Sequence, residues 1–571
     1  MKRISIPIAI AYMAVCSLTL TNCSESASKT SEAESITKQS VVATNAVEFN
    51  MPDVNAPNIP DFKVKLTDYG AVGDGVTLNT EAFKAAIAAV SEKGGGTVVI
   101  PPGIWLTGPI ILESKLELHA ESGALIKFSA DKNLYPIIET SFEGLDTWRC
   151  ISPIYGKHVE DVAFTGEGIW DGSGDAWRHV KRDKLTANQW KKKVASGGYV
   201  HEDRIWYPSK TYRLAEEGAE LNVRKDLTSK EDFEAIKVFL RPVMVSIQNS
   251  KRVLFDGPVF QNSAAWNIHP LMVEDLIVRN ITVRNPWYSQ NGDGLDVESC
   301  KNVIVEHSSF DVGDDAICVK SGKDEDGRNR AVSTENIIIR NNVVYHGHGG
   351  VTVGSEMSGG VKNMHVSNCM FIGTDVGLRF KSKRGRGGVV ENVFISDIRM
   401  IDIPTNAISF NLYYGGLSVS EMMEKGGMQA STEAIPVTEE TPQFKNISIK
   451  DVTINGAKQA VFLQGLPEMN LEHIAIENMQ IVADNGFTII DAADVKIKNI
   501  HLEVNQSNAF TIFNTKDLEL DTTSFNTDSQ EAIKIGGSGN ANIVLKAKEG
   551  QDLSAVTQLN NEVANDAVSF K

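Results

Sequence analysis

Three aspartates in two short, glycine-containing motifs are the first candidates for chemistry in this sequence. Asp293 lies in the motif Asn291-Gly292-Asp293-Gly294, and Asp314 and Asp315 follow in Gly313-Asp314-Asp315. Crowded carboxylates repel one another, which raises the pKa of at least one of them and favours ionisation of another. A protonated acid beside an ionised base is what glycosidic bond hydrolysis requires, because one group protonates the leaving oxygen and the other activates water or attacks carbon.

Two further motifs follow in the same order along the chain. His348 lies between two glycines, and Arg379 and Lys381 flank a phenylalanine, with Lys383, Arg384 and Arg386 close behind. A lone Asp-Asp pair is more often a solvated turn or part of a calcium site, and it is these neighbouring motifs that favour catalysis. Cations concentrated beside acids in an acidic protein indicate an anionic ligand, most simply a sugar carboxylate bound by arginine.

Composition limits the classes of protein to be considered. The 571 residues include 56 Lys+Arg and 73 Asp+Glu, and the formal net charge of −17 argues against a general nucleic-acid partner. With 42% hydrophobic and 23% charged residues, the chain is expected to fold rather than remain disordered. Its length predicts either several domains or one elongated repeat fold.

A turn residue recurs at intervals close to 27 residues through the middle of the chain. Asn and Asp tolerate left-handed backbone, so such a column predicts one bend stacked coil upon coil. A β-propeller would need about 40 residues per blade, so we predict an all-β, parallel β-helix. The 54-residue step from Asp397 to Asp451 is interpreted as two coils, one of them divergent. The column is Asn280, His307, Asn341, Asn368, Asp397, Asp451, Asn478 and Asn499.

A second strand in each coil carries the candidate site. Because side chains alternate along a strand, its apolar positions are predicted to fill the core. The residues between them, Arg379 and Lys381 among them, are expected on a solvent-facing surface. The predicted core positions are Leu295, Val297, Ile317, Val319, Val351, Val353, Leu378, Phe380, Ile408 and Phe410.

Two stretches break the repeat and are interpreted as loop insertions. Residues of about 178–240 are rich in charge and include a helix-compatible run over 229–239, and residues 417–441 mix Met, Glu, Gly and Pro. A shorter extra loop is expected around 323–330. Long loops on a rigid scaffold often carry binding function, so we expect these to wall the site.

The N-terminus is typical of an export signal. Lys2 and Arg3 precede an apolar run to Leu20, so residues 1–23 are predicted to be a signal peptide, 24–60 a flexible tether and 61–571 the catalytic domain. The sequence around Cys23 resembles a lipoprotein cleavage box, although Asn22 departs from the small residue usual there. We therefore expect an exported protein, either secreted, periplasmic or attached to the outer membrane through a lipidated Cys23. The other cysteines, Cys150, Cys300, Cys318 and Cys369, lack zinc-site spacing and are expected to be mostly buried.

Taken together, the four motifs resemble those of the polygalacturonases, the pectin-degrading glycoside hydrolases of family 28. The N-terminal part of the expected solenoid also resembles that of pectin-acting proteins, and the resemblance covers roughly 64–416. It implies a right-handed, single-stranded parallel β-helix of the pectin lyase type and an exported bacterial member of the family. The supporting segments are Asp68 to Gly75, Gly94 to Thr97, Ile100 to Gly103, and Asn262-Ser263 with Trp266 and His269.

The resemblance also implies roles. Asp314 would be the general acid, Asp293 and Asp315 would activate water in an inverting displacement, and His348 would tune the acid. Arg379 and Lys381 would clamp the galacturonate carboxylate, Asn291 would order the site, and Tyr414 or Tyr413 would complete it. No metal or organic cofactor is implied. Two departures are Gly292, where Thr is common, and a longer spacing between Asp314 and His348.

The leading interpretation is hydrolysis of α-1,4 bonds in polygalacturonate, an acidic polysaccharide. Insertion length alone motivates the expectation of attack from the chain end, and an elongated monomer is the default. Rhamnogalacturonan and xylogalacturonan remain alternative substrates. A β-helical polysaccharide lyase would use the aspartates to bind calcium. A non-catalytic glycan-binding module would have no use for three crowded acids.

Overall fold

The computed structural model describes residues 47–220, 222–414, 433–548 and 551–571. The expected signal peptide, the first part of the expected tether and residues 415–432 of the second insertion lie outside the described residues. Within this part of the chain, no helix is both long enough and apolar enough to cross a membrane. All four described cysteines are buried free thiols, as expected.

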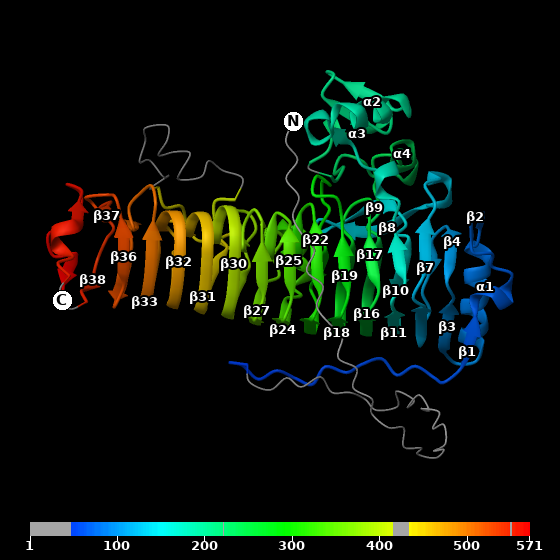
Figure 1. Ribbon diagram of the computed structural model, residues 1–571, viewed down its shortest axis with the longest axis horizontal. Helices are drawn as coiled ribbons and strands as arrows, with labels where there is room; N and C mark the ends of the chain where they lie inside the picture. Colours follow the sequence, from blue (N-terminus) through cyan, green and yellow to red (C-terminus); the bar gives the residue numbers. More distant parts are fainter. Residues whose placement is uncertain (1–46, 221, 415–432, 549–550) are drawn as a thin grey trace, which may run out of the picture. The chain divides into compact units, whose positions relative to one another are not determined.

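From Lys63 onward the chain winds into coils, each contributing up to three strands that pair in parallel with the coils before and after (Figure 1). Parallel strands buried on their inner face need apolar residues at alternate positions, and the repeat supplies them. The prediction of an all-β fold with parallel strands is confirmed.

The strands form three rows. The first row contains β1 (Lys63–Lys65), β3 (Gly96–Ile100), β6 (Leu116–Ala120), β11 (Glu160–Gly166), the second halves of β16 (Val245–Asp256) and β18 (Ile268–Arg279), β21 (Lys301–Glu306), β24 (Thr334–Arg340), β27 (Val361–Ser367), the beginnings of β30 (Val389–Asn411), β31 (Gln443–Gln464), β32 (Leu471–Ile490) and β33 (Ala492–Val504), and then β35 (Lys516–Asp521), β38 (Ile543–Lys546) and β40 (Val568–Phe570). The second row contains β2 (Asp74–Leu78), β4 (Gly103–Thr107), β7 (Ala124–Phe128), β12 (Ile169–Asp171), β17 (Val259–Gln261), β19 (Thr282–Arg284), β22 (Ser309–Val312), β25 (Val343–His346), β28 (Met370–Ile372), the middle parts of β30 to β32, the end of β33, and β36 (Ser524–Thr527). The third row contains β5 (Ile110–Ile111), β10 (Ile154–Lys157), the first halves of β16 and β18, β20 (Leu295–Glu298), β23 (Asp315–Lys320), β26 (Gly349–Gly354), β29 (Leu378–Lys381), the ends of β30 to β32, β34 (Phe510–Phe513), β37 (Ile533–Gly536) and β39 (Thr557–Leu559).

The predicted turn column lies between the first and second rows, and every member has a positive φ. Amide side chains link successive coils, as where Asn368 donates to Asn341 at 2.8 Å and Asn499 donates to Asn478 at 2.9 Å. A second left-handed column, not predicted, runs through Asn302, Asn336, Asn363, Asn392 and Asn446, with amide hydrogen bonds between neighbours.

The interpretation of the 54-residue step as two coils is wrong. Ser396 pairs with Lys450 and Ile398 with Val452, so Asp397 and Asp451 belong to adjacent coils. The additional residues lie between β30, which ends at Asn411, and β31, which begins at Gln443. The second insertion therefore accounts for the long step, because it happens to be about as long as one coil.

The interior holds one continuous apolar cluster that extends through the coils. All ten predicted core positions of the third row are buried in it. Helix α1 (Thr80–Glu92) adds Phe83, Ile87 and Val90 to the same cluster beside the first coils. Burial of each large aliphatic side chain contributes about 1.5–3 kcal/mol relative to exposure, so the stacked core dominates the stability of this part of the chain.

The first insertion forms a lobe between β12 and β16, visible above the strands in Figure 1. A small apolar core of its own includes Tyr212, Phe233 and Phe239. An antiparallel hairpin that the sequence did not predict packs against it. The lobe contains β13 (Val180–Lys181), α2 (Ala187–Ala195), β14 (Tyr199–His201), β15 (Ile205–Tyr207), α3 (Lys210–Glu217) and α4 (Lys230–Ala235), and the hairpin contains β8 (Ile137–Phe142) and β9 (Leu145–Cys150). The extra loop around 323–330 is helix α5 (Asp324–Arg330).

The described end of the expected tether differs from the prediction. Met51 and Val54 are buried against Ile277, Ile304 and Ile338, which face outward from the first row. Polar contacts hold the same segment, including the hydrogen bond from Asn55 to Asp275 at 2.8 Å. Val47, Phe49 and Ala56 pack against the same cluster, so residues 47–60 form a strap along the coils rather than a free linker.

Candidate active site

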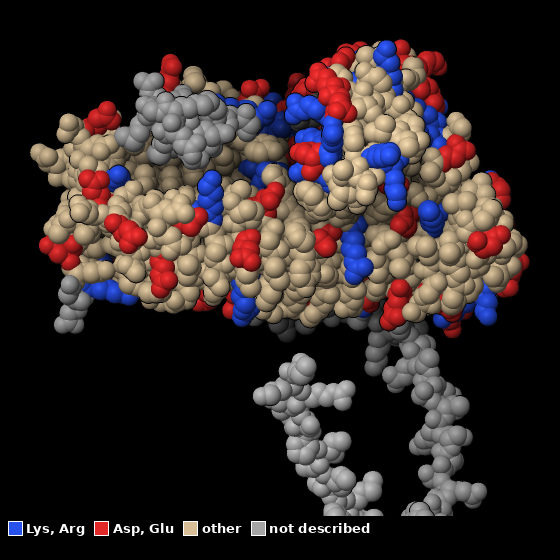
Figure 2. Space-filling view, turned by 45° about the horizontal axis from the view of Figure 1, so that its top comes forward, with Lys and Arg blue, Asp and Glu red and all other residues tan. Residues whose placement is uncertain are grey.

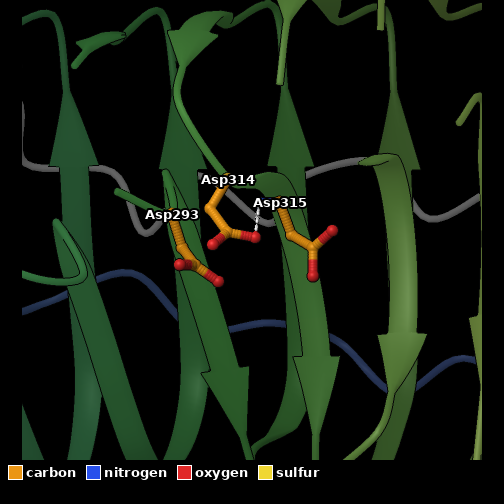
Figure 3. A group of neighbouring side chains, drawn as sticks. All are labelled: Asp293, Asp314 and Asp315. Carbon is orange, nitrogen blue, oxygen red and sulfur yellow. Dashed lines mark hydrogen bonds between the residues drawn. The ribbon is translucent and has the colours of Figure 1, made fainter. Parts of the chain in front are cut away.

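The three predicted aspartates converge at the start of the third-row strands. Asp315 is the first residue of β23, Asp314 precedes it, and Asp293 lies two residues before β20. The Gly294 amide donates to the Asp315 carbonyl at 2.9 Å, which holds the two turns side by side. One carboxylate oxygen from each aspartate lies within 4.8 Å of the others, and Figure 3 shows the side chains from neighbouring coils. The expectation that they meet is confirmed.

Asp315 is buried and saturated with donors. Arg379 Nη1 and Thr352 Oγ1 each donate to its Oδ1 at 3.0 Å, and Lys381 Nζ donates to its Oδ2 at 2.7 Å. Burial alone would raise the pKa of Asp315, but Lys381 and Arg379 outweigh burial and hold it well below the usual range. Asp315 is therefore ionised across the neutral range.

The other two carboxyls are shifted in the opposite direction. Burial, followed by the charge of Asp315, raises the pKa of Asp314. Burial, followed by the charges of Asp296 and Asp314, raises the pKa of Asp293 well above its usual value. Neighbouring acids whose pKa values are driven apart can divide the roles of proton donor and ionised carboxylate.

Asp296 is a fourth acid at the site that sequence reasoning missed. It is fully buried, neither carboxylate oxygen has a hydrogen-bond partner among the described residues, and Lys320 Nζ lies 3.6 Å away. The signal was available, since Asp296 follows Asp293 by three residues in a strand where Asp is unfavourable.

The predicted solvent-facing surface is instead covered. Asp296, Glu298 and Lys320 occupy outward positions but are at most 3% exposed. Arg330 of α5 contacts Glu298 at 2.8 Å, and Lys320 lies 4.8 Å from the Trp266 ring centroid. The surrounding loops therefore bury a layer of charged side chains, which remain stable because each cation is paired with acids.

Arg379 and Lys381 point outward from the core, as predicted, but they are not freely exposed. Both side chains are about nine-tenths buried, and both bind Asp315. The ring of Tyr414 lies 5.7 Å from the Arg379 guanidinium and 5.1 Å from the Lys381 ammonium, whereas Tyr413 lies beside Arg384. Tyr414 is thus the tyrosine that reaches the site.

The cations that follow Lys381 are engaged with nearby acids. Arg384 makes two bonds of 2.7 Å to Glu468, and Arg386 pairs with Asp324 and lies 3.8 Å from Glu356. These two arginines consequently fix loops around the site and contribute little free positive charge.

His348 lies one coil beyond Asp314, as expected, and its backbone amide donates to the Asp314 carbonyl at 2.9 Å. Its Nδ1 is 2.7 Å from Asp375 Oδ2, a contact that sequence reasoning missed. The hydrogen bond with His348 outweighs burial and lowers the pKa of Asp375. Asp375 follows β28 as His348 follows β25, so coil periodicity could have located it.

Asn291 is anchored by the first insertion. Its Oδ1 accepts from Arg241 Nη2 at 2.8 Å and from Asn222 Nδ2 at 3.1 Å. The buried Arg241 also donates to the carbonyls of Ala264 and Gln290, at 3.0 and 2.8 Å. The expectation that this insertion borders the site is confirmed.

Gly292, the departure from the family motif, has a steric cause. A Cβ atom at this position would lie 1.9 Å from Ser289 Oγ, and one at Gly313 would lie 2.4 Å from the same atom. The loop of residues 285–291 therefore packs directly onto the catalytic turns. A threonine at position 292 would require Ser289 to move or change.

The three aspartates are close enough together to be considered as cation ligands. However, Arg379, Lys381 and Thr352 already engage both oxygens of Asp315. The positive charge that a metal ion would bring is thus supplied to Asp315 by side chains.

Figure 2 shows Lys and Arg side chains in a hollow beside the lobe of the first insertion. A cleft of about 1400 Å³ lies between the hairpin, α5 and the 383–385 turn, with Trp148 and Arg328 among its lining residues. None of the predicted site residues lines that cleft.

Comparisons with known proteins agree on one family. Residues 240–439 match the model described as "Glycosyl hydrolases family 28", and residues 63–135 match "Rhamnogalacturonase A/epimerase, pectate lyase-like". The first match contains every predicted site residue.

Relatives and solved structures cover most of the chain. It is 27% identical over 426 residues to a protein named "Probable polygalacturonase" from Vitis vinifera, covering 73% of each chain. It is 25% identical over 449 residues to the exo-poly-alpha-D-galacturonosidase of Dickeya chrysanthemi, covering 76% of this chain and 70% of the relative. The structure of a hyperthermoactive exopolygalacturonase from Thermotoga maritima aligns with a TM-score of 0.61 and 30% identity, over 84% of this chain and 93% of that one.

Proposed function

The chain belongs to glycosyl hydrolase family 28, and we propose that it hydrolyses the α-1,4 bonds of polygalacturonate from the chain end. The observation that carries this proposal is the site itself, where an ionised Asp315 lies beside Asp314 and Asp293, whose pKa values are raised. Such a site can give a proton to a leaving oxygen while a neighbouring carboxylate activates water.

Asp314 is proposed as the proton donor. It is the most accessible of the three aspartates, and its raised pKa keeps a larger fraction protonated than an ordinary carboxyl. His348, one coil away and hydrogen bonded to Asp375, lowers the pKa of Asp314 when charged and so tunes the acid. We propose that Tyr414 and Asn291 position the substrate.

We propose that water, rather than an aspartate, attacks the sugar. Both oxygens of Asp315 are held in place by Lys381, Arg379 and Thr352, which keeps this carboxylate from moving onto the sugar carbon while its negative charge can still orient a water molecule. Water activated by Asp315 and Asp293 would invert the anomeric centre. One oxygen from each aspartate lies within 4.8 Å of the others, which is a shorter measure than the separation of about 6.5–9.5 Å between whole carboxyl groups that admits water in inverting enzymes. Proton NMR of the first product formed tests this, since retention of the anomer would exclude the inverting route.

Attack from the chain end is supported by the first insertion, which borders the site through Asn222 and Arg241. It is also supported by the exo-acting enzymes among the relatives. Small products alone, from the earliest time points, would agree with this mode of attack. A ladder of intermediate oligomers would instead identify an endo-acting enzyme.

The decisive experiment combines three readouts on polygalacturonate, with and without a chelator. We expect new reducing ends without unsaturated products, unaffected by the chelator and lost with Asp314→Asn. Unsaturated products that disappear with the chelator would identify a calcium-dependent lyase. Absence of any product would direct the search to rhamnogalacturonan or xylogalacturonan, and binding without turnover on any pectic polymer would indicate a glycan-binding module.

Three further features belong to the proposal. The solenoid is right-handed and single-stranded, as expected of this family. Residues 1–23 direct export of the protein, and a lipid on Cys23 attaches it to a membrane. Cell fractionation tests the attachment, since Cys23→Ser is expected to release the protein from the membrane fraction. It is a monomer, which light scattering of the purified protein tests.

A further inference from the structure

One aromatic side chain at the edge of the site has no role in the proposed chemistry. Trp287 is 56% exposed, although large aromatic residues lose favourable free energy when left in water. It lies in the loop of residues 285–291, which follows β19 and packs onto the catalytic turns.

This loop is held rigidly. The Asn285 amide donates to the Asp311 carbonyl at 2.8 Å, and its side chain donates to Ser263 Oγ at 2.9 Å and to the Gly292 carbonyl at 3.1 Å. Ser289 is buried and its Oγ donates to the Pro286 carbonyl at 2.7 Å. Trp287 is therefore presented to solvent by a fixed loop, which lowers the entropic cost of binding against it.

A lysine from the first insertion meets this ring. Lys184 Nζ lies 4.5 Å from the centroid of Trp287. Within the described part of the chain no carboxylate pairs with Lys184, whereas Arg379 and Lys381 are both committed to Asp315. The hydrogen bond to His348 is the main cause of the lowered pKa of Asp375, and Lys184 contributes to the same shift, which places its charge on the His348 side of the site.

We infer that Trp287 and Lys184 form a substrate-binding subsite for a galacturonosyl residue next to the scissile bond. The apolar face of a sugar ring stacks on the indole, and the sugar carboxylate pairs with the ammonium. The lysine stem is flexible, so the charge can move from the ring to the carboxylate while the rigid indole stays in place. This inference rests on the proposed function and adds a specificity determinant to it.

The test measures kcat and KM on polygalacturonate for the full-length protein and single variants. Trp287 does not contact the reacting groups, so Trp287→Ala is expected to raise KM about tenfold or more with kcat changed less than twofold. Trp287→Phe, which keeps a flat apolar surface, is expected to recover most of the loss. Lys184→Gln is expected to raise KM severalfold at low ionic strength, with the difference disappearing at high salt.

Trp148 and Lys230 provide the matched control. Lys230 Nζ lies 6.0 Å from the Trp148 ring centroid, at the cleft that contains no predicted site residue. Trp148→Ala and Lys230→Gln are expected to leave KM unchanged. Should Trp287→Ala fold poorly, Lys184→Gln still decides the question, because it removes no buried group.

The possible failures are distinguishable. If the wild type hydrolyses polygalacturonate and the KM values of Trp287→Ala and Lys184→Gln match the wild type, the subsite is overturned and the proposed function stands. A fall in kcat with unchanged KM would also overturn it, since the loop would then act on the catalytic turns. If the wild type does not cleave polygalacturonate and the Asp314→Asn variant does not bind it, both the subsite and the proposed function are overturned.

Discussion

The third row of strands has one backbone design but two kinds of outer surface. In β20, β23 and β29 the outward positions hold Asp296, Glu298, Lys320, Arg379 and Lys381, with Cys318 as an uncharged member. Further along the same row, in β31, β32 and β34, the outward positions hold Phe462, Gln464, Thr488, Ile490 and Phe513.

Strand pairing makes the two regions directly comparable. Lys381 pairs with Asn411, which pairs with Gln464. The charged Lys381 and the neutral Gln464 therefore occupy the same position two coils apart. The inward residues remain apolar in both regions. The solenoid backbone therefore fixes only the positions of the outward side chains. The types of these side chains determine the chemistry.

We call the outward face of β20, β23 and β29 the charged region and that of β31, β32 and β34 the neutral region. The largest effect is expected when a residue type of the neutral region is placed in the charged region. Lys381→Gln reproduces the residue found at position 464 and removes a donor from Asp315. Because preorganised charges of this kind commonly contribute 100- to 1000-fold to rate, kcat/KM is expected to fall by about that factor.

The same variant also changes the pH profile. Lys381 lowers the pKa of Asp315, so its loss raises that pKa. Because Asp315 is required in its ionised form, the variant is expected to lose activity at a higher pH than the wild type does. The acid limb of the kcat/KM profile therefore moves to higher pH. Lys534→Gln, the same substitution at an outward position of β37, is the control, and an unmoved acid limb would contradict the assigned role of Lys381.

The next effect concerns stability. Lys320 pairs with Glu356 at 3.0 Å and Asp296 at 3.6 Å. Lys320→Met removes the cation paired with Asp296 and one of the two cations near Glu356, the other being Arg386 at 3.8 Å. It is expected to cost about 3–5 kcal/mol of unfolding free energy. Gln464→Met, in the same column of the sheet, is expected to change stability by less than about 1.5 kcal/mol. Denaturant titration compares the two, and equal losses would refute the distinction between the regions.

A single acid with a raised pKa also occurs in the neutral region. Burial, followed by the charge of Glu468, raises the pKa of Asp491 from 3.8 to about 7. A raised native pKa favours folding at low pH, and this contribution is lost as the pH rises from about 4 to about 7. Asp491→Asn does not titrate, so the variant is expected to gain stability relative to wild type over that range, by at most about 4 kcal/mol.

Thermal unfolding at several pH values measures this gain for Asp491→Asn, and activity measured alongside should remain unchanged. A difference in stability that does not vary with pH would contradict a raised pKa of Asp491 in the native protein. Unchanged activity would show that a raised pKa away from the three clustered aspartates performs no chemistry.

The smallest effect should be the same in both regions. Asn368 and Asn478 hold left-handed turns and donate to the coil before, at 2.8 and 3.1 Å. Alanine at either position loses the hydrogen bond and strains the turn, for an expected cost of about 1–2 kcal/mol. Glycine, which accepts the conformation, should cost less. Unequal losses between the two alanine variants would show that the scaffold differs between the regions.

Periodicity made the scaffold predictable. The left-handed turns, the inward residues and the meeting of Asp293, Asp314 and Asp315 all follow from one repeat, because stacked parallel strands convert sequence spacing into position. The error over the 54-residue step arose where an insertion had nearly the length of a coil.

What the sequence did not predict comes from segments outside the repeat. The burial of Asp296 and Lys320, the anchoring of Asn291 by Arg241 and the pairing of Arg386 with Asp324 depend on how the hairpin, the first insertion and α5 fold over the strands. These contacts join the strands and their turns to inserted segments, for which no repeat specifies a partner. Trp287 was missed because exposed aromatic residues have no periodic signature.

The strap of residues 47–60 is synthesised before the coils but can dock only after them. In a repeat fold each coil contacts mainly its neighbours, so coils can form in succession as the chain emerges. The strap departs from this pattern, since Glu48 pairs with His365 at 2.8 Å across 317 positions of sequence. The earliest described part of the polypeptide must therefore wait for more than half of the chain to be made before it can dock.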